Sequence, residues 1–297
     1  MNNLVKKFGE EKRMYDTLKI NYLFDEDIDV CNYVSSRLGN FNIGKINYGR
    51  VILTEELFVK SLFELRIFDD DIYSRIKTII DGVSIYSEYE EIDRFTTVVG
   101  FKVNDDGSIF TDLGIVDSYV IPYSIYELSI YHMAHEHIHA LKETNYYEYK
   151  DGITIGETIS IFLELVIYHQ NGILSGELIK TRLKSLATNK REYMFYDNLI
   201  RFRGIYERDS NGKIKDQEVC MYEFLRSRVG CYLNSFYYAI ILYSMYKVNS
   251  DKILNLINKV LKHDITTYDM LNYLGLYGDI RGDVFEKELK YIRKRFK

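Results

Sequence analysis

Residues 154 to 167 read Thr-Ile-Gly-Glu-Thr-Ile-Ser-Ile-Phe-Leu-Glu-Leu-Val-Ile. Thr154 is placed to cap a helix, with Glu157 at the third position after it. From residue 158 to residue 167 nearly every side chain is apolar, which predicts a helix that is buried on all sides. This helix nevertheless carries two carboxylates, Glu157 and Glu164. They are two helical turns apart and therefore face the same side.

The two carboxylates need partners, because burying an unpaired charge is costly. One alternative is structural: Glu164 pairs with an arginine from elsewhere in the chain. The other alternative is a metal ion that the carboxylates hold together with histidines. Histidines at metal-binding spacing favour the second alternative.

Residues 135 to 139 read His-Glu-His-Ile-His, which is the pattern H-E-x-x-H. In a helix, His135 and His139 lie one turn apart on one face, where a single Zn²⁺ can bind both imidazoles. Glu136 then lies beside the open position of the metal and can take a proton from a zinc-bound water. Glu157, 18 residues beyond His139, is the candidate third ligand. Glu164 can accept a hydrogen bond from a ligand histidine or a neighbouring group.

The chain as a whole is predicted to be mainly α-helical. Its 297 residues include one proline, and long helices tolerate proline poorly. Apolar residues recur at helical spacing through residues 4–91, and further helices are expected at residues 124–142, 158–167, 173–188, 192–202, 216–246, 250–261 and 267–276. A β-hairpin is expected from residues 95–103 and 109–116, directly before the helix that carries the histidines, and residues 119–123 are expected to be extended. These patterns divide the chain into an N-terminal helical part, residues 1–94, and a compact second part, residues 95–297.

Composition and charge exclude several classes of protein. The formal net charge is −5 and basic residues are scattered, which does not suggest nucleic-acid binding. The longest apolar runs, such as residues 237–246, are too short to span a bilayer, and the charged N-terminus carries no secretory signal. Cys31, Cys220 and Cys231 form no C-x-x-C pair, which favours a reducing compartment. The sequence therefore predicts a cytoplasmic protein that binds neither nucleic acid nor membrane.

The H-E-x-x-H segment, followed by Gly156-Glu157-Thr-Ile-Ser-Ile-Phe-Leu-Glu164, resembles the metal site of the thimet oligopeptidase and oligoendopeptidase F family of zinc metallopeptidases. The resemblance covers residues 90–280. It implies a mainly α, zincin-like helical catalytic domain, with His135, His139 and Glu157 as zinc ligands and Glu136 as the catalytic base.

A second segment also resembles this family. Residues 232 to 243 read Tyr-Leu-Asn-Ser-Phe-Tyr-Tyr-Ala-Ile-Ile-Leu-Tyr and resemble the tyrosine-rich helix that faces the metal. The family's tyrosine hydroxyls stabilise the oxyanion that forms when water attacks a peptide carbonyl. Tyr237 is the first candidate for that catalytic role, ahead of Tyr238 and Tyr243, and packing at a helix interface is the alternative for each of them.

Together these features predict a zinc-dependent metallopeptidase that hydrolyses peptide bonds of oligopeptides. The alternative is a catalytically weak or inactive peptidase-like protein that binds peptides or a protein partner. Cys231 motivates this alternative because it stands near the place where family members carry a histidine, and the chain is shorter than those members. A helical scaffold with an accidental H-E-x-x-H, and a hydrolase that acts on something other than peptides, are two further hypotheses.

Overall fold

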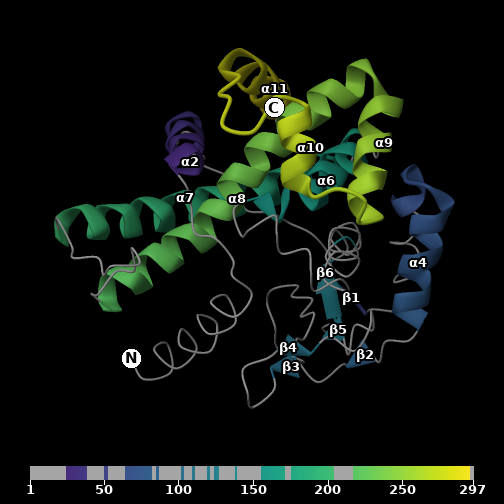
Figure 1. Cartoon of the computed structure of the whole chain (residues 1–297), viewed down its shortest axis with the longest axis horizontal. Coiled ribbons are helices and arrows are strands. Elements are labelled where there is room, and N and C mark those ends of the chain that lie inside the picture. The colour runs from purple at the N-terminus through teal and green to yellow at the C-terminus, as the bar shows by residue number, and fades with distance from the viewer. Residues whose placement is uncertain are drawn as a thin grey trace.

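The computed structural model is mostly helical, which confirms the predicted mainly α class (Figure 1). It describes residues 25–38, 50–52, 64–81, 85–86, 102–103, 109–110, 119–120, 124–126, 138, 155–170, 175–203 and 217–294. Within these residues, no helix is both long and apolar enough to cross a membrane.

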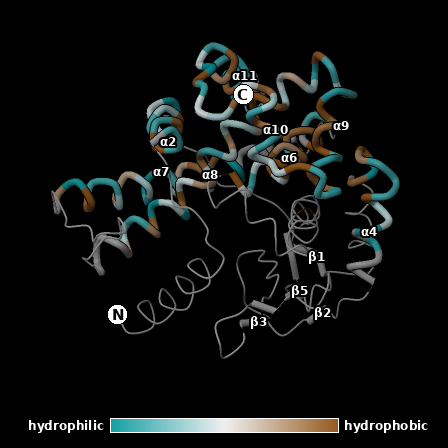
Figure 2. The backbone as a smooth tube through the Cα atoms, in the orientation of Figure 1, coloured by the Kyte–Doolittle hydropathy of each residue, from teal (hydrophilic) through white to brown (hydrophobic). Residues whose placement is uncertain are grey.

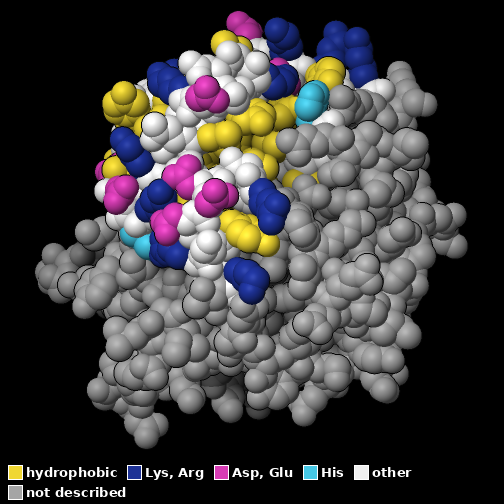
Figure 3. Space-filling view, turned by 90° about the vertical axis from the view of Figure 1, so that its right-hand side faces the viewer, with side chains coloured by type: hydrophobic (Ala, Val, Ile, Leu, Met, Phe, Trp, Pro, Cys, Tyr) yellow, Lys and Arg dark blue, Asp and Glu magenta, His cyan; other side chains and the backbone are white. Residues whose placement is uncertain are grey.

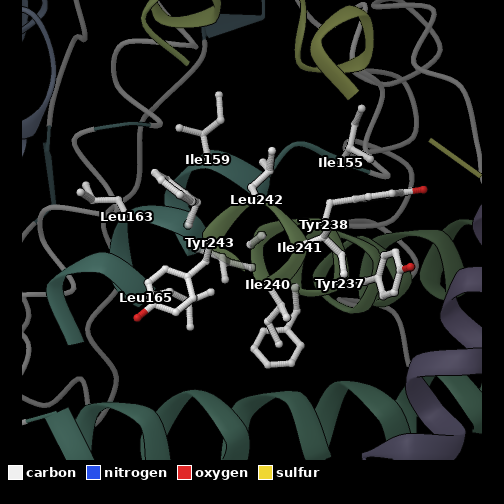
Figure 4. Close-up of a cluster of buried hydrophobic side chains, with 14 of the residues drawn as sticks. Ile155, Ile159, Leu163, Leu165, Tyr237, Tyr238, Ile240, Ile241, Leu242 and Tyr243 are labelled. Atoms are coloured by element: carbon white, nitrogen blue, oxygen red, sulfur yellow. The ribbon is translucent and has the colours of Figure 1, made fainter. Parts of the chain in front are cut away.

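Helix α8 (Gln217–Val248) is the central element of the structure. Every side chain from Leu233 to Tyr243 is buried, so this part of the helix is enclosed on all sides. The helices that pack against it are α2 (Asp25–Arg37), α6 (Thr158–Gln170), α7 (Ser175–Arg203), α9 (Ser250–Leu261) and α11 (Gly282–Lys294). Hydrophobic segments meet along α6, α8 and α9 (Figure 2), and the core side chains interdigitate there (Figure 4).

Helices α7 and α8 run antiparallel along their length. Asp197 of α7 accepts a hydrogen bond from Arg226 of α8 at 2.8 Å, and the rings of Tyr196 and Tyr222 stack nearby. The inner side of α7 is buried, at Leu186, Tyr193 and Ile200 among others, whereas its outer side faces solvent.

A buried polar network joins α2 to α8. The fully buried carboxylate of Asp27 accepts hydrogen bonds from the Asn234 amide at 3.3 Å and from the Tyr277 hydroxyl at 3.1 Å. The Cys31 thiol donates to the amide oxygen of Asn234 at 2.9 Å. Burial raises the pKa of this thiol well above its ordinary value, and the nearby Asp27 charge adds to the effect, so Cys31 remains a donor. The network gives hydrogen-bond partners to both ends of the Asn234 amide, which α8 carries into the core.

The C-terminal helices close the other side of the core. Lys247 of α8 donates to Glu288 of α11, and the capping box of Thr266 and Asp269 starts α10 (Thr267–Tyr273). Asn258 of α9 donates to Asp69 at 2.7 Å, which attaches the short helix η1 (Glu64–Ile67) and helix α4 (Asp70–Asp81). On this side of the molecule, acidic and basic side chains are interspersed over the described surface (Figure 3).

Short strands form three separate pairs. β1 (Arg50–Ile52) pairs antiparallel with β6 (Ser124–Tyr126), and β2 (Ile85–Tyr86) pairs parallel with β5 (Tyr119–Val120). β3 (Lys102–Val103) pairs antiparallel with β4 (Ile109–Phe110) inside the predicted hairpin. The remaining residues of that hairpin lie outside the described part of the chain, so the hairpin as predicted from the sequence stays a prediction.

Several boundaries differ from the sequence predictions. The helix expected to begin at Ser124 does not begin there, because residues 124–126 form β6, and residues 50–52 and 85–86 are strands within the part expected to be helical. Pairing with a distant strand overrides local helical patterning at these positions. The break expected between residues 188 and 192 is also wrong: α7 is continuous, and no glycine or proline interrupts it there.

Other helices confirm their predictions. α9 has the predicted ends, α6 includes all of residues 158–167, and α8 covers nearly the same range as predicted. Helix α10 begins at the predicted Thr267 but ends at Tyr273, three residues before the predicted end. Thr154, the predicted cap of α6, lies outside the described residues.

Helices α9 and α10 end in the same backbone motif with different residues. In α9, the amides of His263 and Asp264 donate back to Val260 and Lys259, and His263 adopts a left-handed φ of 69°. In α10, Gly275 holds the equivalent position with φ 61°. A side chain is disfavoured in this conformation, so α9 retains strain that α10 avoids.

We expect His263→Gly to raise the free energy of unfolding by about 0.5–1 kcal/mol, because relief of left-handed strain outweighs the added freedom of the unfolded chain. The matched control is Gly275→Ala, whose new Cβ would make an ordinary van der Waals contact with the Arg281 side chain at 3.8 Å and no clash. It should lower stability by about 1 kcal/mol through φ alone. Urea unfolding of both variants tests this expectation, and a destabilised His263→Gly would contradict it.

Candidate functional site

Glu157 lies at the first turn of α6. Its carbonyl oxygen accepts the amide of Ile161 at 2.9 Å, so Glu157 opens the hydrogen-bond ladder of the helix. The residue is half-buried, whereas the helix that follows it is buried from Thr158 to Ile167. The α6 dipole stabilises an ionised carboxylate at this end. Glu157 therefore supplies a charged carboxylate at the edge of the core.

Glu164 lies two turns further along and has a different environment. Its side chain is 1% exposed, and Arg182 of α7, 8% exposed, binds it with two hydrogen bonds. The bond from Nε of Arg182 to Oε2 of Glu164 is 2.7 Å long. This two-bond geometry between a guanidinium and a carboxylate compensates the buried charge. The structural alternative considered for Glu164, an arginine partner, is thus what the structure contains.

Tyr232 of α8 lies close enough to Glu157 and Arg182 for their charges to act on its hydroxyl. The negative charge of Glu157 raises the pKa of the Tyr232 hydroxyl well above its ordinary value, burial raises it further, and Arg182 and Arg228 oppose the shift. The interaction between two charges weakens with distance, so the charged groups of Glu157 and Arg182 lie in the same region as the Tyr232 hydroxyl. The hydroxyl of Tyr232 therefore remains protonated beside an acidic and basic cluster.

The packing of α6 against α8 supports this placement. Tyr243 lies 11 residues, or three turns, after Tyr232 on the same helix face. Its ring lies 6.0 Å from that of His169 at the end of α6, and Tyr246 contacts Phe162 with ring centroids 5.6 Å apart. The face of α8 that carries Tyr232 is therefore the face that packs on α6.

Tyr237 projects from another side of α8. It is five residues after Tyr232, which turns its side chain by about 140° around the helix. Its hydroxyl donates to the carbonyl of Asp279 at 3.0 Å and accepts the amide of Arg281. Burial is the main cause that raises the pKa of Tyr237 to about 12. Tyr237 therefore attaches the segment before α11 to the core, and its catalytic assignment stays a prediction.

The two other candidate tyrosines are placed as follows. The Tyr238 hydroxyl accepts the amide of Gly278 at 3.2 Å, and its ring stacks on that of Tyr277. The Tyr243 ring lies under the ammonium group of Lys247, 4.9 Å from the ring centroid. In Figure 4, Tyr237 and Tyr238 project together at one end of the hydrophobic cluster and Tyr243 lies at the other.

His135, Glu136 and His139 lie outside the described residues. Ile138, between the last two of these, is helical and fully buried in the same core as α6 and α8. Among the described residues, no three histidine, cysteine, aspartate or glutamate side chains come together as a metal site requires. Glu157 is the one proposed ligand among the described residues, and a carboxylate is one of the ligand types that Zn²⁺ takes in proteins.

Two members of this cluster were missed from the sequence, Arg182 and Tyr232. Arg182 lies 18 residues beyond Glu164 on another helix, and no local pattern connects the two. For Tyr232 a signal existed, since its helical phase matches that of Tyr243 and differs from that of Tyr237. That phase identifies a common face without showing which neighbour covers it.

Comparison of the chain with protein-family models, with curated proteins and with solved structures finds no match in any of the three.

We expect Arg182→Met to lower the free energy of unfolding by about 3–5 kcal/mol, because it leaves the Glu164 charge buried without its partner. Adding Glu164→Leu should recover most of this loss, since an apolar pair of similar volume avoids the desolvation cost. Arg201→Met is the control in the same helix: Arg201 is 67% exposed and pairs with Asp197, so its loss should cost at most about 1 kcal/mol. Denaturant unfolding of the unmodified protein, Arg182→Met, Glu164→Leu and the double variant measures the coupling. Equal effects of Arg182→Met in the presence and absence of Glu164 would show that the pair contributes no interaction energy.

Proposed function

We propose that the protein is a zinc-dependent metallopeptidase that hydrolyses peptide bonds of oligopeptides and that is similar to the thimet oligopeptidase and oligoendopeptidase F family. The observation that carries the proposal is the H-E-x-x-H segment combined with Glu157, a half-buried carboxylate directly before a helix that is buried from Thr158 to Ile167. Ile138 supports it, because a buried helical residue inside the motif attaches that segment to the core that α6 and α8 share. The proposed fold is a zincin-like helical catalytic domain.

The proposed ligands are His135, His139 and Glu157. A zinc ion held there supplies Lewis-acid activation of water and of the scissile carbonyl. Glu136 accepts a proton from the attacking water and delivers it to the leaving amine. Arg182 holds Glu164 and so ties α6 to α7, which keeps Glu157 in place at the start of α6.

Tyr232 is the hydrogen-bond donor that we propose for the substrate carbonyl oxygen, in place of Tyr237. A tyrosine hydroxyl is protonated at neutral pH, and Tyr232 lies on the face of α8 that packs on α6, the helix that Glu157 precedes. A donor aimed at the oxygen where negative charge develops accelerates the reaction more than it strengthens substrate binding. Tyr237, by contrast, has its hydroxyl engaged by Asp279 and Arg281.

We also propose a cytoplasmic location. Two of the three cysteines, Cys31 and Cys231, are buried free thiols, as expected in a reducing compartment.

A second candidate function is peptide binding without turnover. Cys231 favours it, because this residue stands near the position of the family histidine and is only 6% exposed, which leaves it poorly placed to contact a substrate. Hydrolysis by the unmodified protein distinguishes the two functions.

The first test separates the catalytic base from a metal ligand. Glu136→Gln should retain zinc at near one equivalent and lose cleavage of an internally quenched peptide, because only the proton acceptor is removed. Glu157→Gln should lose zinc affinity as well as cleavage. Metal analysis after purification without chelator and a fluorescence assay measure both properties. Turnover in Glu136→Gln, or a zinc-free unmodified protein, would refute the proposed mechanism.

The second test compares two tyrosines on the same helix. Tyr232→Phe should lower kcat by roughly 100-fold with little change in KM, as expected for loss of a donor to the oxyanion. Tyr237→Phe should keep kcat and lose about 1 kcal/mol of stability, because the Arg281 amide and the Asp279 carbonyl lose their partner. Steady-state kinetics and urea unfolding of both variants decide the assignment. The reverse result, with kcat lost in Tyr237→Phe, would restore Tyr237 as the catalytic donor.

A further inference from the structure

The outer face of α7 combines aromatic and basic side chains. Lys184, Arg191, Phe195 and Phe202 are exposed and lie within about 40° of one line along the helix. Phe195 is 59% exposed and Phe202 is 90% exposed. The opposite stripe of α7 is buried against the core, so this face has no partner among the described residues. In Figure 1, α7 reaches the left edge of the helical part of the molecule.

The concentration of apolar side chains at this end of α7 is unusual. Of the eight large hydrophobic side chains exposed in the described chain, three lie between Met194 and Phe202. Tyr196, next to Phe195, stacks on Tyr222 of α8, which leaves Phe195 on the side that faces solvent. Grouped exposed apolar side chains mark a surface that binds a partner.

The charges around these phenylalanines select the kind of partner. Lys184, Arg191 and Arg201 are exposed, whereas Glu192 is the one exposed acidic residue between positions 182 and 202. Asp197, the other acidic residue of this segment, is buried between Arg201 and Arg226. Two copies of such a face would repel each other, whereas an anionic surface would attract it.

We propose that the outer face of α7 binds an anionic lipid surface, with Phe195 and Phe202 inserted at the headgroup boundary and Lys184 and Arg191 against lipid phosphates. The phenylalanines protrude from a convex helix, and a fluid lipid interface receives protruding side chains without a matching groove. The basic side chains add attraction to anionic headgroups. The protein lies on the surface and does not span it, consistent with the absence of a spanning helix in the described residues. This inference departs from the sequence prediction that the protein binds no membrane, and it does not depend on the proposed peptidase activity.

The test uses the full chain and vesicles of equal parts phosphatidylglycerol and phosphatidylcholine, with pure phosphatidylcholine vesicles as the comparison. The protein should sediment with the anionic vesicles alone, and added salt should weaken the association. The double variant Phe195→Ser with Phe202→Ser should bind at least about tenfold more weakly, because each phenylalanine loses its apolar burial. Arg191→Gln should weaken binding about fivefold.

Tyr273→Ser is the matched control, because Tyr273 is an aromatic residue 72% exposed on α10, away from this face. It should bind vesicles like the unmodified protein.

Absence of vesicle binding, or equal binding by the double phenylalanine variant, would overturn the proposal. Self-association in the absence of lipid that is lost in the same double variant would overturn it too, since a second copy would then cover the face. Binding to an acidic protein partner without binding to anionic vesicles would also overturn it.

Discussion

Burial of α8 on all sides is the constraint on which the rest of the structure depends. From Leu233 to Tyr243 the helix has no solvent-facing side, so its neighbours must cover every direction. A large polar side chain on this stretch needs partners inside the protein. Asn234 finds Asp27 and Cys31 of α2, and this requirement positions a helix from near the start of the chain against one from near its end.

Burial in the core also places Glu157 and Glu164, two turns apart, in different environments. Glu164 lies two turns into a buried helix, and Arg182 compensates its charge from α7. Glu157 lies directly before that helix, where it is half-buried. Glu164 therefore stabilises the packing of α6 against α7, whereas Glu157 lies at the edge of the core, where its charge acts on Tyr232.

Local patterns predicted the helices well where a helix carries its own start and stop signals. α9 begins after Asn249, whose side chain accepts the amide of Lys252, and both of its predicted ends are confirmed. Prediction was wrong for Ser124, which starts β6, because strand pairing is decided by a partner more than 70 residues away in the sequence. For the candidate site, the sequence identified Glu157 and Glu164 on one face and an arginine as one alternative partner, but not which arginine. His135, Glu136 and His139 remain sequence predictions.

The sequence by itself determined the helical class, the buried character of α6 and α8, and the position of Glu157 and Glu164 on one side of a helix. These follow from hydrophobic periodicity and helix geometry, which are local properties. The tertiary structure alone decided that Arg182 pairs with Glu164, that Tyr232 faces α6 while Tyr237 holds the segment before α11, and that α7 turns two phenylalanines to solvent. The physical reason is that helical phase fixes which residues share a face, whereas only the packing of separate helices determines what that face meets.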